Sequence, residues 1–243
     1  MSMARSLGLI AAGALVGGLV VTEHAADAGG TAAARPPRFD NPVANPYYPI
    51  TPGLVTRLHG TDDGERFHEV VHVTHRTKVI QGVQTTVVVD VLRRADGTLA
   101  EKTHDWYADD NDGNVWYFGE RTATYDRHGH VKSRAGSWEA GVDGATAGTI
   151  MPADPRATDA YRQEYLRGQA EDQAWLVQRG KSVRVPAGRF GHVLKSLEWS
   201  RLEPGVVSVK LYAPGVGIIL EHDLAGGTET FRLTSVDPRP GRS

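Results

Sequence analysis

Short runs of apolar and β-branched residues, separated by turn residues, fill most of the chain after residue 53. In the first half these runs span residues 54–59, 67–79, 83–92, 99–107 and 115–125. Asp63-Gly64, Gln81-Gly82 and Asp112-Gly113 stand between successive runs. An Asp-Gly pair between two apolar runs favours a hairpin, because both central residues of the preferred turn take positive φ. The pattern predicts a meander of antiparallel strands.

The same pattern returns near the C-terminus. Apolar runs cover residues 183–185, 190–199, 206–212, 216–221 and 230–236. Turn residues separate them, at 186–188, 203–205, 213–215 and 225–227, and each of these turns contains glycine. Strands with turns about every ten residues predict a second antiparallel meander.

One segment between the two meanders has helical spacing. Asp154-Pro155 is typical of a helix start, with an Asp cap and Pro at the first helical position. Apolar residues then follow at near-helical intervals from Tyr161 to Val177. We therefore expect a mainly β (α+β) fold: a curved antiparallel meander sheet or half-barrel with one helical segment near 155–178.

The N-terminus has the features of an export signal. Arg5 precedes an apolar run over residues 7–21, and Ala26-Asp27-Ala28 follows as an Ala-x-Ala cleavage site. A membrane-spanning helix usually needs ~20 apolar residues, so a cleaved signal is favoured over a retained anchor. The expected organisation is a signal peptide at 1–28, a Pro/Ala/Gly-rich linker at 29–52, one β-rich domain at 53–236 and a tail at 237–243.

Composition narrows the function classes. The chain has no Cys, which excludes disulfides, thiolate nucleophiles, Cys-ligated zinc and a lipid anchor on an N-terminal Cys. The formal net charge of -2 gives no electrostatic support for binding nucleic acid. No second long apolar run follows the first, so we expect no integral membrane span in the mature chain and a secreted or periplasmic location.

His68-Glu69-Val70-Val71-His72 matches the H-E-x-x-H pattern of zinc hydrolases. On a helix the two His share one face and bind Zn²⁺ while the Glu acts as general base. The surrounding residues are rich in Val, Ile and Thr, which favour a strand. On a strand the two His stand ~13 Å apart and do not chelate one ion, so the pattern favours the strand over zinc.

Acidic residues crowd the turn near residue 110. Asp109, Asp110 and Asp112 suggest a Ca²⁺ loop, since hard cations take carboxylate oxygens. If Gly113 were the sixth position of an EF-hand loop, the first position would be Ala108, which has no carboxylate. A polar hairpin tip that closes an aromatic cross-strand cluster is the competing interpretation, and it leaves no cofactor expected.

Aromatic and acidic residues in the strands supply the candidate binding site. If several strand acids converge on the concave side of one curved sheet, their pKa values rise and they bind cations or transfer protons. The acids near apolar residues are Asp105, Glu120, Glu139, Glu198 and Glu221. The candidate ligand-binding residues are Trp106, Trp116, Tyr117, Trp138, Trp175, Glu120, Glu198 and Glu221.

Three segments resemble a family of uncharacterised exported bacterial proteins. They are residues 105–120, with the motifs Asp105-Trp106-Tyr107 and Trp116-Tyr117-Phe118-Gly119-Glu120; residues 185–190; and residues 212–217. The last two look like the strand-turn pattern of periplasmic half-barrel domains, in which a curved antiparallel sheet wraps a helix or an apolar cleft. The resemblance implies this fold and no catalytic residues.

These observations favour a secreted, non-catalytic protein that binds a small apolar molecule or an envelope component in an aromatic-lined cleft. Two alternatives remain open at this stage. One is a metal-dependent hydrolase that uses His68, Glu69 and His72, and the other is a Ca²⁺-stabilised structural or interaction protein.

Overall fold

The computed structural model describes residues 36–238, so the expected signal peptide lies outside the described residues. Over this range the chain forms one antiparallel sheet of fifteen strands. The strands of the first meander are β1 (Val55–Asp62), β2 (Glu65–Ile80), β3 (Val83–Arg94), β4 (Leu99–Asp109) and β5 (Val115–Tyr125). Short strands follow as β6 (Val131–Ser133), β7 (Trp138–Glu139), β8 (Thr146–Met151), β9 (Ala160–Arg162) and β10 (Glu164–Tyr165). The last five are β11 (Asp172–Val185), β12 (Gly188–Ser200), β13 (Val207–Ala213), β14 (Gly217–Ala225) and β15 (Thr230–Asp237).

The hairpins form where the turn residues predict them. Asp63 and Gly64 have φ of 48° and 75°, and Gln81 and Gly82 have φ of 49° and 81°. Two successive residues with positive φ match the right-handed twist of the strands that they join. Both meanders are confirmed, although β11 begins at Asp172 and so is much longer than the run expected at 183–185.

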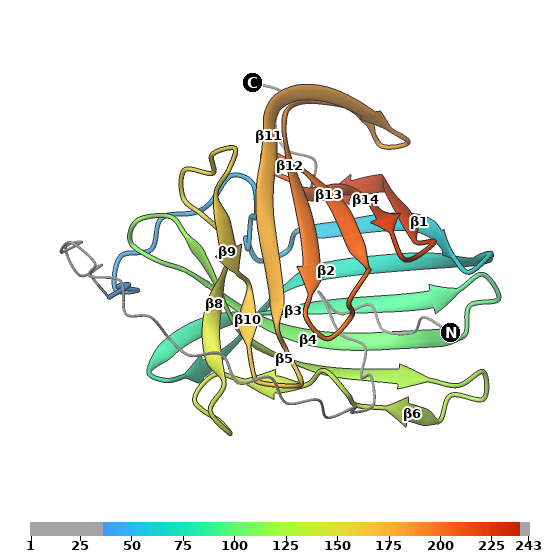
Figure 1. Ribbon diagram of the computed structural model, residues 1–243, viewed down its shortest axis with the longest axis horizontal. Helices are drawn as coiled ribbons and strands as arrows, with labels where there is room; N and C mark the ends of the chain where they lie inside the picture. The colour runs from blue at the N-terminus through green and yellow to red at the C-terminus, as the bar shows by residue number, and fades with distance from the viewer. Residues whose placement is uncertain (1–35, 239–243) are drawn as a thin grey trace, which may run out of the picture.

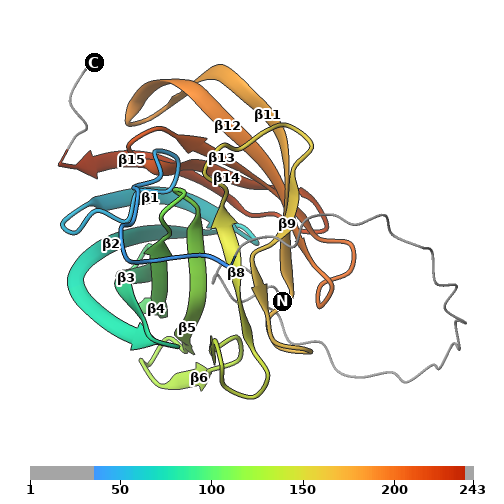
Figure 2. The same cartoon turned by 90° about the vertical axis from the view of Figure 1, so that its left-hand side faces the viewer.

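The two meanders join into a nearly closed, barrel-shaped sheet. Strand β1 pairs with both β2 and β15, so the first and last parts of the chain lie side by side. Figure 2 shows β2 to β5 forming one side of the barrel and β11 to β15 the other. The ends of the sheet are β10, paired with β8, and β9, paired with β11. Because β9 and β10 are consecutive, residues 160–165 bridge the two ends.

The predicted helix near 155–178 is wrong, and no helix that could span a membrane is found among residues 36–238. Residues 160–162 pair instead with Gln173–Trp175 of β11. The Asp154 carboxylate accepts hydrogen bonds from Arg156 and Arg179 and caps no helix. In β11 the alternate residues Ala174 and Leu176 are fully buried. The apolar spacing from Tyr161 to Val177, which predicted a helix, also fits a strand that follows a turn. Pairing with other strands has decided between the two.

Residues 38–50 form a strap that packs against the barrel (Figure 1, blue). The buried Asn45 side chain donates hydrogen bonds to the carbonyls of Gly113 and Pro152, at 2.8 and 2.9 Å. The Tyr47 hydroxyl donates to the carbonyl of His192. Tyr47 and Ile50 are buried in the apolar core, so this end of the expected linker is part of the folded domain.

Closure of the barrel depends on a glycine in β8. A Cβ atom on Gly148 would lie 2.4 Å from the backbone carbonyl of Gln163. Real Cβ atoms do not approach backbone atoms so closely, so a side chain here would push residues 160–165 away from β8.

We expect Gly148→Ala to destabilise the protein by about 1–3 kcal/mol, the usual cost of overpacking. Urea denaturation of the purified protein measures the loss. Gly191→Ala is the matched control, because its Cβ would meet only the Ser182 hydroxyl, at 3.9 Å. Equal stability of the two variants would contradict this role for Gly148.

Candidate functional site

Alternation along the strands places acidic side chains inside the barrel. On β4 the residues Glu101, Thr103, Asp105 and Tyr107 recur at every second position, and all four are at most 5% exposed. Successive strand residues point to opposite faces of a sheet, so these four share the inner face. The interior of this barrel is therefore a core with ionisable groups and not a purely apolar one.

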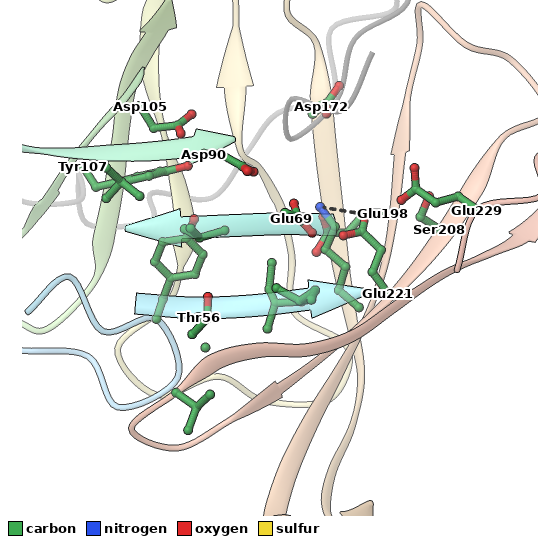
Figure 3. Close-up of a pocket in the computed structure, with 18 of the residues that line it drawn as sticks. Thr56, Glu69, Asp90, Asp105, Tyr107, Asp172, Glu198, Ser208, Glu221 and Glu229 are labelled. Carbon is green, nitrogen blue, oxygen red and sulfur yellow. Dashed lines mark ion pairs between the residues drawn. The ribbon is translucent and has the colours of Figure 1, made fainter. Parts of the chain in front are cut away.

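A cavity of about 390 Å³ lies within the barrel. Pockets for small ligands usually measure ≈ 300–1,000 Å³. Figure 3 shows its acidic side chains on several strands. One part of the wall is apolar or aromatic, formed by Tyr48, Ile50, Leu54, Leu58, Val73 and Val88. Another part is acidic, formed by Glu69, Asp90, Asp105, Asp172, Glu198, Glu203, Glu221, Asp223 and Glu229.

The exposed loop residues Gly226 and Gly227 also line the cavity. They lie between β14 and β15, and this loop marks the outer end of the cavity. Tyr48 and Pro49 of the strap line it elsewhere. Tyr48 stacks edge-on against Tyr107, with ring centroids 5.2 Å apart. The strap therefore supplies part of the cavity wall.

Lys210 is the one basic side chain among the described residues that line the cavity. Its Nζ lies 2.9 Å from Glu198 Oε2 and 3.5 Å from Glu221 Oε1. The other Glu198 oxygen accepts hydrogen bonds from Ser196 and Tyr212, at 2.7 Å each. Burial alone would raise the pKa of Glu198, but Lys210 and these donors lower it overall. Glu198 is therefore a paired, ionised group.

Burial raises the pKa values of other interior carboxyls. Burial raises the pKa of Asp105 to about 7, although a hydrogen bond from Tyr117 partly opposes the shift. Burial likewise raises the pKa of Asp172 to about 7. Burial and the nearby Glu69 carboxyl hold the pKa of Asp90 well above its ordinary value. Asp105 and Asp172 therefore titrate near neutral pH, which is typical of functional sites.

Some polar atoms in this region make no hydrogen bond within residues 36–238. They are Oδ1 of Asp90, Oδ1 of Asp172 and the hydroxyl of Tyr107, all in side chains that line the cavity. Tyr107 is 1% exposed and Asp172 is 7% exposed. Buried polar atoms are nearly always satisfied, and each exception calls for a physical explanation. A bound molecule that donates hydrogen bonds would supply one.

A second polar cluster lies deeper in the barrel. The Tyr117 hydroxyl is 2.8 Å from Asp105 Oδ1 and 3.1 Å from Glu120 Oε2. Trp138 donates from Nε1 to Glu164 Oε2 at 2.8 Å, and its ring packs edge-on against Tyr117. These side chains contact one another and, apart from Asp105, do not line the cavity.

The residues proposed from the sequence divide between the two faces of the sheet. Glu198 and Glu221 line the cavity, and Tyr117, Trp138 and Glu120 are buried in the deeper cluster. The remaining three, Trp106, Trp116 and Trp175, do not line the cavity.

Each of these three tryptophans has another environment. Lys78 Nζ lies 3.6 Å from the Trp106 ring centroid, and Trp116 donates from Nε1 to Asp110. Trp175 is 42% exposed. Glu139 from the set of strand acids pairs with Lys78 at 2.6 Å, and so does not converge with the others.

The H-E-x-x-H segment is extended, as the sequence predicted. It lies in β2, where His68 and His72 are exposed and Glu69 turns inward to line the cavity. The His68 ring packs against His59 of β1, with centroids 4.2 Å apart. The two His and the Glu therefore lie on opposite faces of the sheet. Within residues 36–238 no three His, Cys, Asp or Glu side chains are grouped to hold a metal ion.

The acidic turn near residue 110 is organised by its own hydrogen bonds. Oδ1 of Asp110 accepts from the backbone N–H groups of Asp112 and Asn114, and Oδ2 accepts from the side chains of Asn114 and Trp116. The carboxylate is thus occupied in shaping the hairpin tip, as the competing interpretation of this turn expected. Burial raises the pKa of the neighbouring Asp109 to about 6.

Sequence reasoning missed several cavity residues: Tyr48, Asp90, Tyr107, Asp172 and Lys210. A signal for Lys210 was present, because Ser208, Lys210 and Tyr212 recur at every second position within an apolar run. Asp172 fell in the segment that was expected to be helical. Asp90 follows five unbroken Thr and Val residues, at 85–89, which give no indication of which face of the strand is buried.

Comparison with known proteins gives a fold likeness only. No family model matches the chain, and no curated protein matches it. A protein from Bacteroides fragilis, provisionally described as exported and with a YmcC-like fold, matches at a TM-score of 0.46 and 16% identity. A protein from Parabacteroides distasonis, provisionally described as a lipoprotein, matches at a TM-score of 0.45 and 14% identity. Each alignment covers 80% of this chain and 100% of the other.

The interior carboxyls make stability depend on pH. Between about pH 4 and pH 7 the folded protein keeps protons on Asp105 and Asp172 that the unfolded chain has released, so stability falls as pH rises. Burial lowers the pKa of His59 and His104, which acts in the opposite direction. We expect the decline from about pH 5 to about pH 8, measured by urea denaturation, to be smaller in Asp105→Asn than in the wild type. The exposed Asp143→Asn serves as control, and an unchanged decline in Asp105→Asn would contradict the assignment.

Removing the buried cation should be costly. Lys210→Met leaves Glu198 buried and ionised without its partner, and we expect a loss of about 3–5 kcal/mol in urea denaturation. The double variant Lys210→Met/Glu198→Gln should lose less than the sum of the single variants. Arg156→Met, which breaks an exposed ion pair with Asp154, is the matched control. Strict additivity of the two interior substitutions would show that the pair is not coupled.

Proposed function

We propose that this protein is an extracytoplasmic, non-catalytic binding protein that holds one small organic molecule inside the barrel. The observation that carries the proposal is the interior cavity, with an apolar wall facing buried polar atoms that lack partners. Such a wall, with a few placed polar groups, suits a small ligand with an apolar body. The apolar run at residues 7–21 with its Ala-x-Ala site supports the extracytoplasmic location.

The arrangement of the ionisable groups favours binding over hydrolysis. Glu198 is held by Lys210, Ser196 and Tyr212, so its charge is already neutralised by its neighbours. Glu69 lines the cavity while His68 and His72 are exposed on the other face, so the zinc-hydrolase pattern does not assemble around the cavity. The polar groups of the cavity then serve to orient a ligand.

The neutral fluorescent probe N-phenyl-1-naphthylamine tests the proposal. We expect one molecule to bind per chain, with a rise in fluorescence as the probe leaves water. Val71→Trp places a large ring in the cavity from β2 and should weaken binding about 10-fold or more, which is about 1.4 kcal/mol.

Val79→Trp is the matched control, because Val79 lies on the same strand and is 66% exposed. Circular dichroism verifies the fold of each variant, and Val71→Phe replaces Val71→Trp if the latter does not fold. Absence of saturable binding to the wild type, or equal binding by the Val71 and Val79 variants, would refute an interior site.

A further inference from the structure

We infer that the outer face of strands β15, β1, β2, β3, β4 and β5 binds a linear anionic polysaccharide, whose acidic groups lie against rows of basic side chains. The inference concerns the outside of the barrel and does not depend on a ligand in the cavity. We call this surface the outer basic face, and its members are Arg57, His59, His68, His72, Arg93, Lys102, His104, Arg121 and Arg232.

The register of the strands gathers these side chains into rows that run across the sheet. Arg232 of β15 pairs with His59 of β1, and His59 pairs with His68 of β2. His68 pairs in turn with Arg93 of β3. All four side chains are exposed. Directly paired residues point to the same face of a sheet, so this row presents four basic or titratable side chains on four neighbouring strands.

A second row begins two residues further along β1, about 7 Å away at the rise of a β-strand. Arg57 pairs with Val70 of β2, which pairs with Val91 of β3. Val91 pairs in turn with Lys102 of β4. Because a step of two residues returns to the same face, Arg57 and Lys102 point outward with the first row.

The third row extends the face to β5. His72 of β2 pairs with Val89 of β3, and Val89 pairs with His104 of β4. His104 pairs in turn with Arg121 of β5. The outer basic face therefore crosses six neighbouring strands, from β15 to β5.

The acids of the same strands point the other way. Glu69, Asp90 and Asp105 line the cavity, and Glu101 and Glu120 are 4% and 1% exposed. Several of them are chain neighbours of residues in the outer basic face, so alternation sends the acid inward and the base outward. The sheet thus separates charge that nearly cancels in the formal total of -2.

Little negative charge remains on the outside to neutralise this face. Asp237, the last residue of β15, pairs with Val55 and is the one acid of the described strands that the register places in these rows. The four permanently charged side chains without an ion pair to any residue in 36–238 or a hydrogen bond to another side chain there are Arg57, Lys102, Arg121 and Arg232.

The positive charges act on one another. Burial lowers the pKa of His104, and the nearby charges of Arg121, Lys102 and Arg76 lower it further. Like charges that face each other across strands destabilise a sheet. Anionic groups on this surface would relieve the repulsion, so the face suits a partner that carries many negative charges.

The curvature of the face favours a linear chain over a flat surface. The five strand spacings from β15 to β5 amount to about 24 Å. Figure 2 shows β15 and β5 on different sides of the barrel. A planar membrane would contact one of these sides at a time, whereas a linear polymer can follow the curve and meet all three rows.

The residue types favour a polysaccharide among linear anionic polymers. Proteins that bind single-stranded nucleic acid usually stack its bases on aromatic side chains, and the three rows contain no Phe, Tyr or Trp. Arg and Lys bind anionic groups through charge-assisted hydrogen bonds, which need no stacking. The apolar run at residues 7–21 with its Ala-x-Ala site supports a location outside the cytoplasm, where anionic polysaccharides occur.

Two fluorescein-labelled polymers of equal length test the inference: dextran sulfate and uncharged dextran. Fluorescence anisotropy of the purified protein, at about pH 7.5 and low salt, should show dextran sulfate binding about 10-fold or more tightly than dextran. Its affinity should fall about 10-fold or more between about 50 and 200 mM NaCl, because binding to a polyanion releases counterions.

The triple variant Arg57→Gln/Arg121→Gln/Arg232→Gln removes one charge from each row. All three side chains are exposed, so the fold should be kept, and circular dichroism verifies it. We expect the affinity for dextran sulfate to fall about 10-fold or more, which is about 1.4 kcal/mol. Replacing the same three residues with Lys keeps the charge and should retain most of the affinity.

The matched control is Lys181→Gln/Arg184→Gln/Arg189→Gln, which makes the same change in net charge. These three exposed side chains lie on the β11–β12 hairpin, outside the outer basic face. The control should leave the affinity for dextran sulfate nearly unchanged. An equal or larger loss in the control would show that this face is not the binding surface, and would overturn the inference.

Labelled oligothymidylate and vesicles of phosphatidylglycerol distinguish the other anionic partners. We expect both to bind more weakly than dextran sulfate. Tighter binding of either one, lost in the triple variant of the outer basic face, would assign the face to nucleic acid or to a membrane and overturn the inference. Absence of dextran sulfate binding, or equal binding of dextran, would overturn it as well. None of these outcomes affects the proposed function, which N-phenyl-1-naphthylamine tests separately.

Discussion

The ion pair between Lys210 and Glu198 is the interaction on which the interior of this barrel depends. A barrel-shaped sheet turns one face of every strand inward, and here that face carries acidic residues on β2, β3, β4, β11, β12 and β14. A buried charge is costly unless it is paired and hydrogen-bonded. Lys210 pairs with Glu198 and Glu221, and burial raises the pKa of Asp105 and of Asp172 to about 7. One cation therefore offsets part of the negative charge in an acid-rich interior.

The strap and the bridging strands complete the barrel around this interior. Residues 38–50 add Tyr48 and Ile50 to the cavity wall, and residues 160–165 connect the two ends of the sheet. Both are short segments without a long strand of their own. Their positions depend on individual contacts, such as the Asn45 amide with the Gly113 and Pro152 carbonyls and the close approach of Gly148 to Gln163. The barrel and its cavity therefore depend on irregular parts of the chain as well as on the main strands.

The turn residues predict much of the fold, because they determine where the hairpins form. The positions of the site residues depend instead on the register between paired strands. Asp63-Gly64 and Gln81-Gly82 predicted the hairpins because their conformational needs are local. Residues 155–178 were wrongly expected to be helical, since pairing between β9 and β11 joins segments that a local pattern cannot connect. On β5, Tyr117 pairs with Tyr107 and Glu120 pairs with Asp105, so three steps on one strand match two on the other. Simple alternation from Tyr117 would place Glu120 outside, although it is 1% exposed.

The buried acids also change the net charge of the folded protein, and with it the movement of the protein in an electric field. The formal charge of -2 counts every Asp and Glu as ionised. Burial, however, raises the pKa values of Asp90 and Glu164 well above their ordinary range, and Asp105 and Asp172, with pKa values of about 7, are only partly ionised near neutral pH. The folded protein is therefore less negative than its composition suggests, and its native isoelectric point lies above that of the same chain in urea.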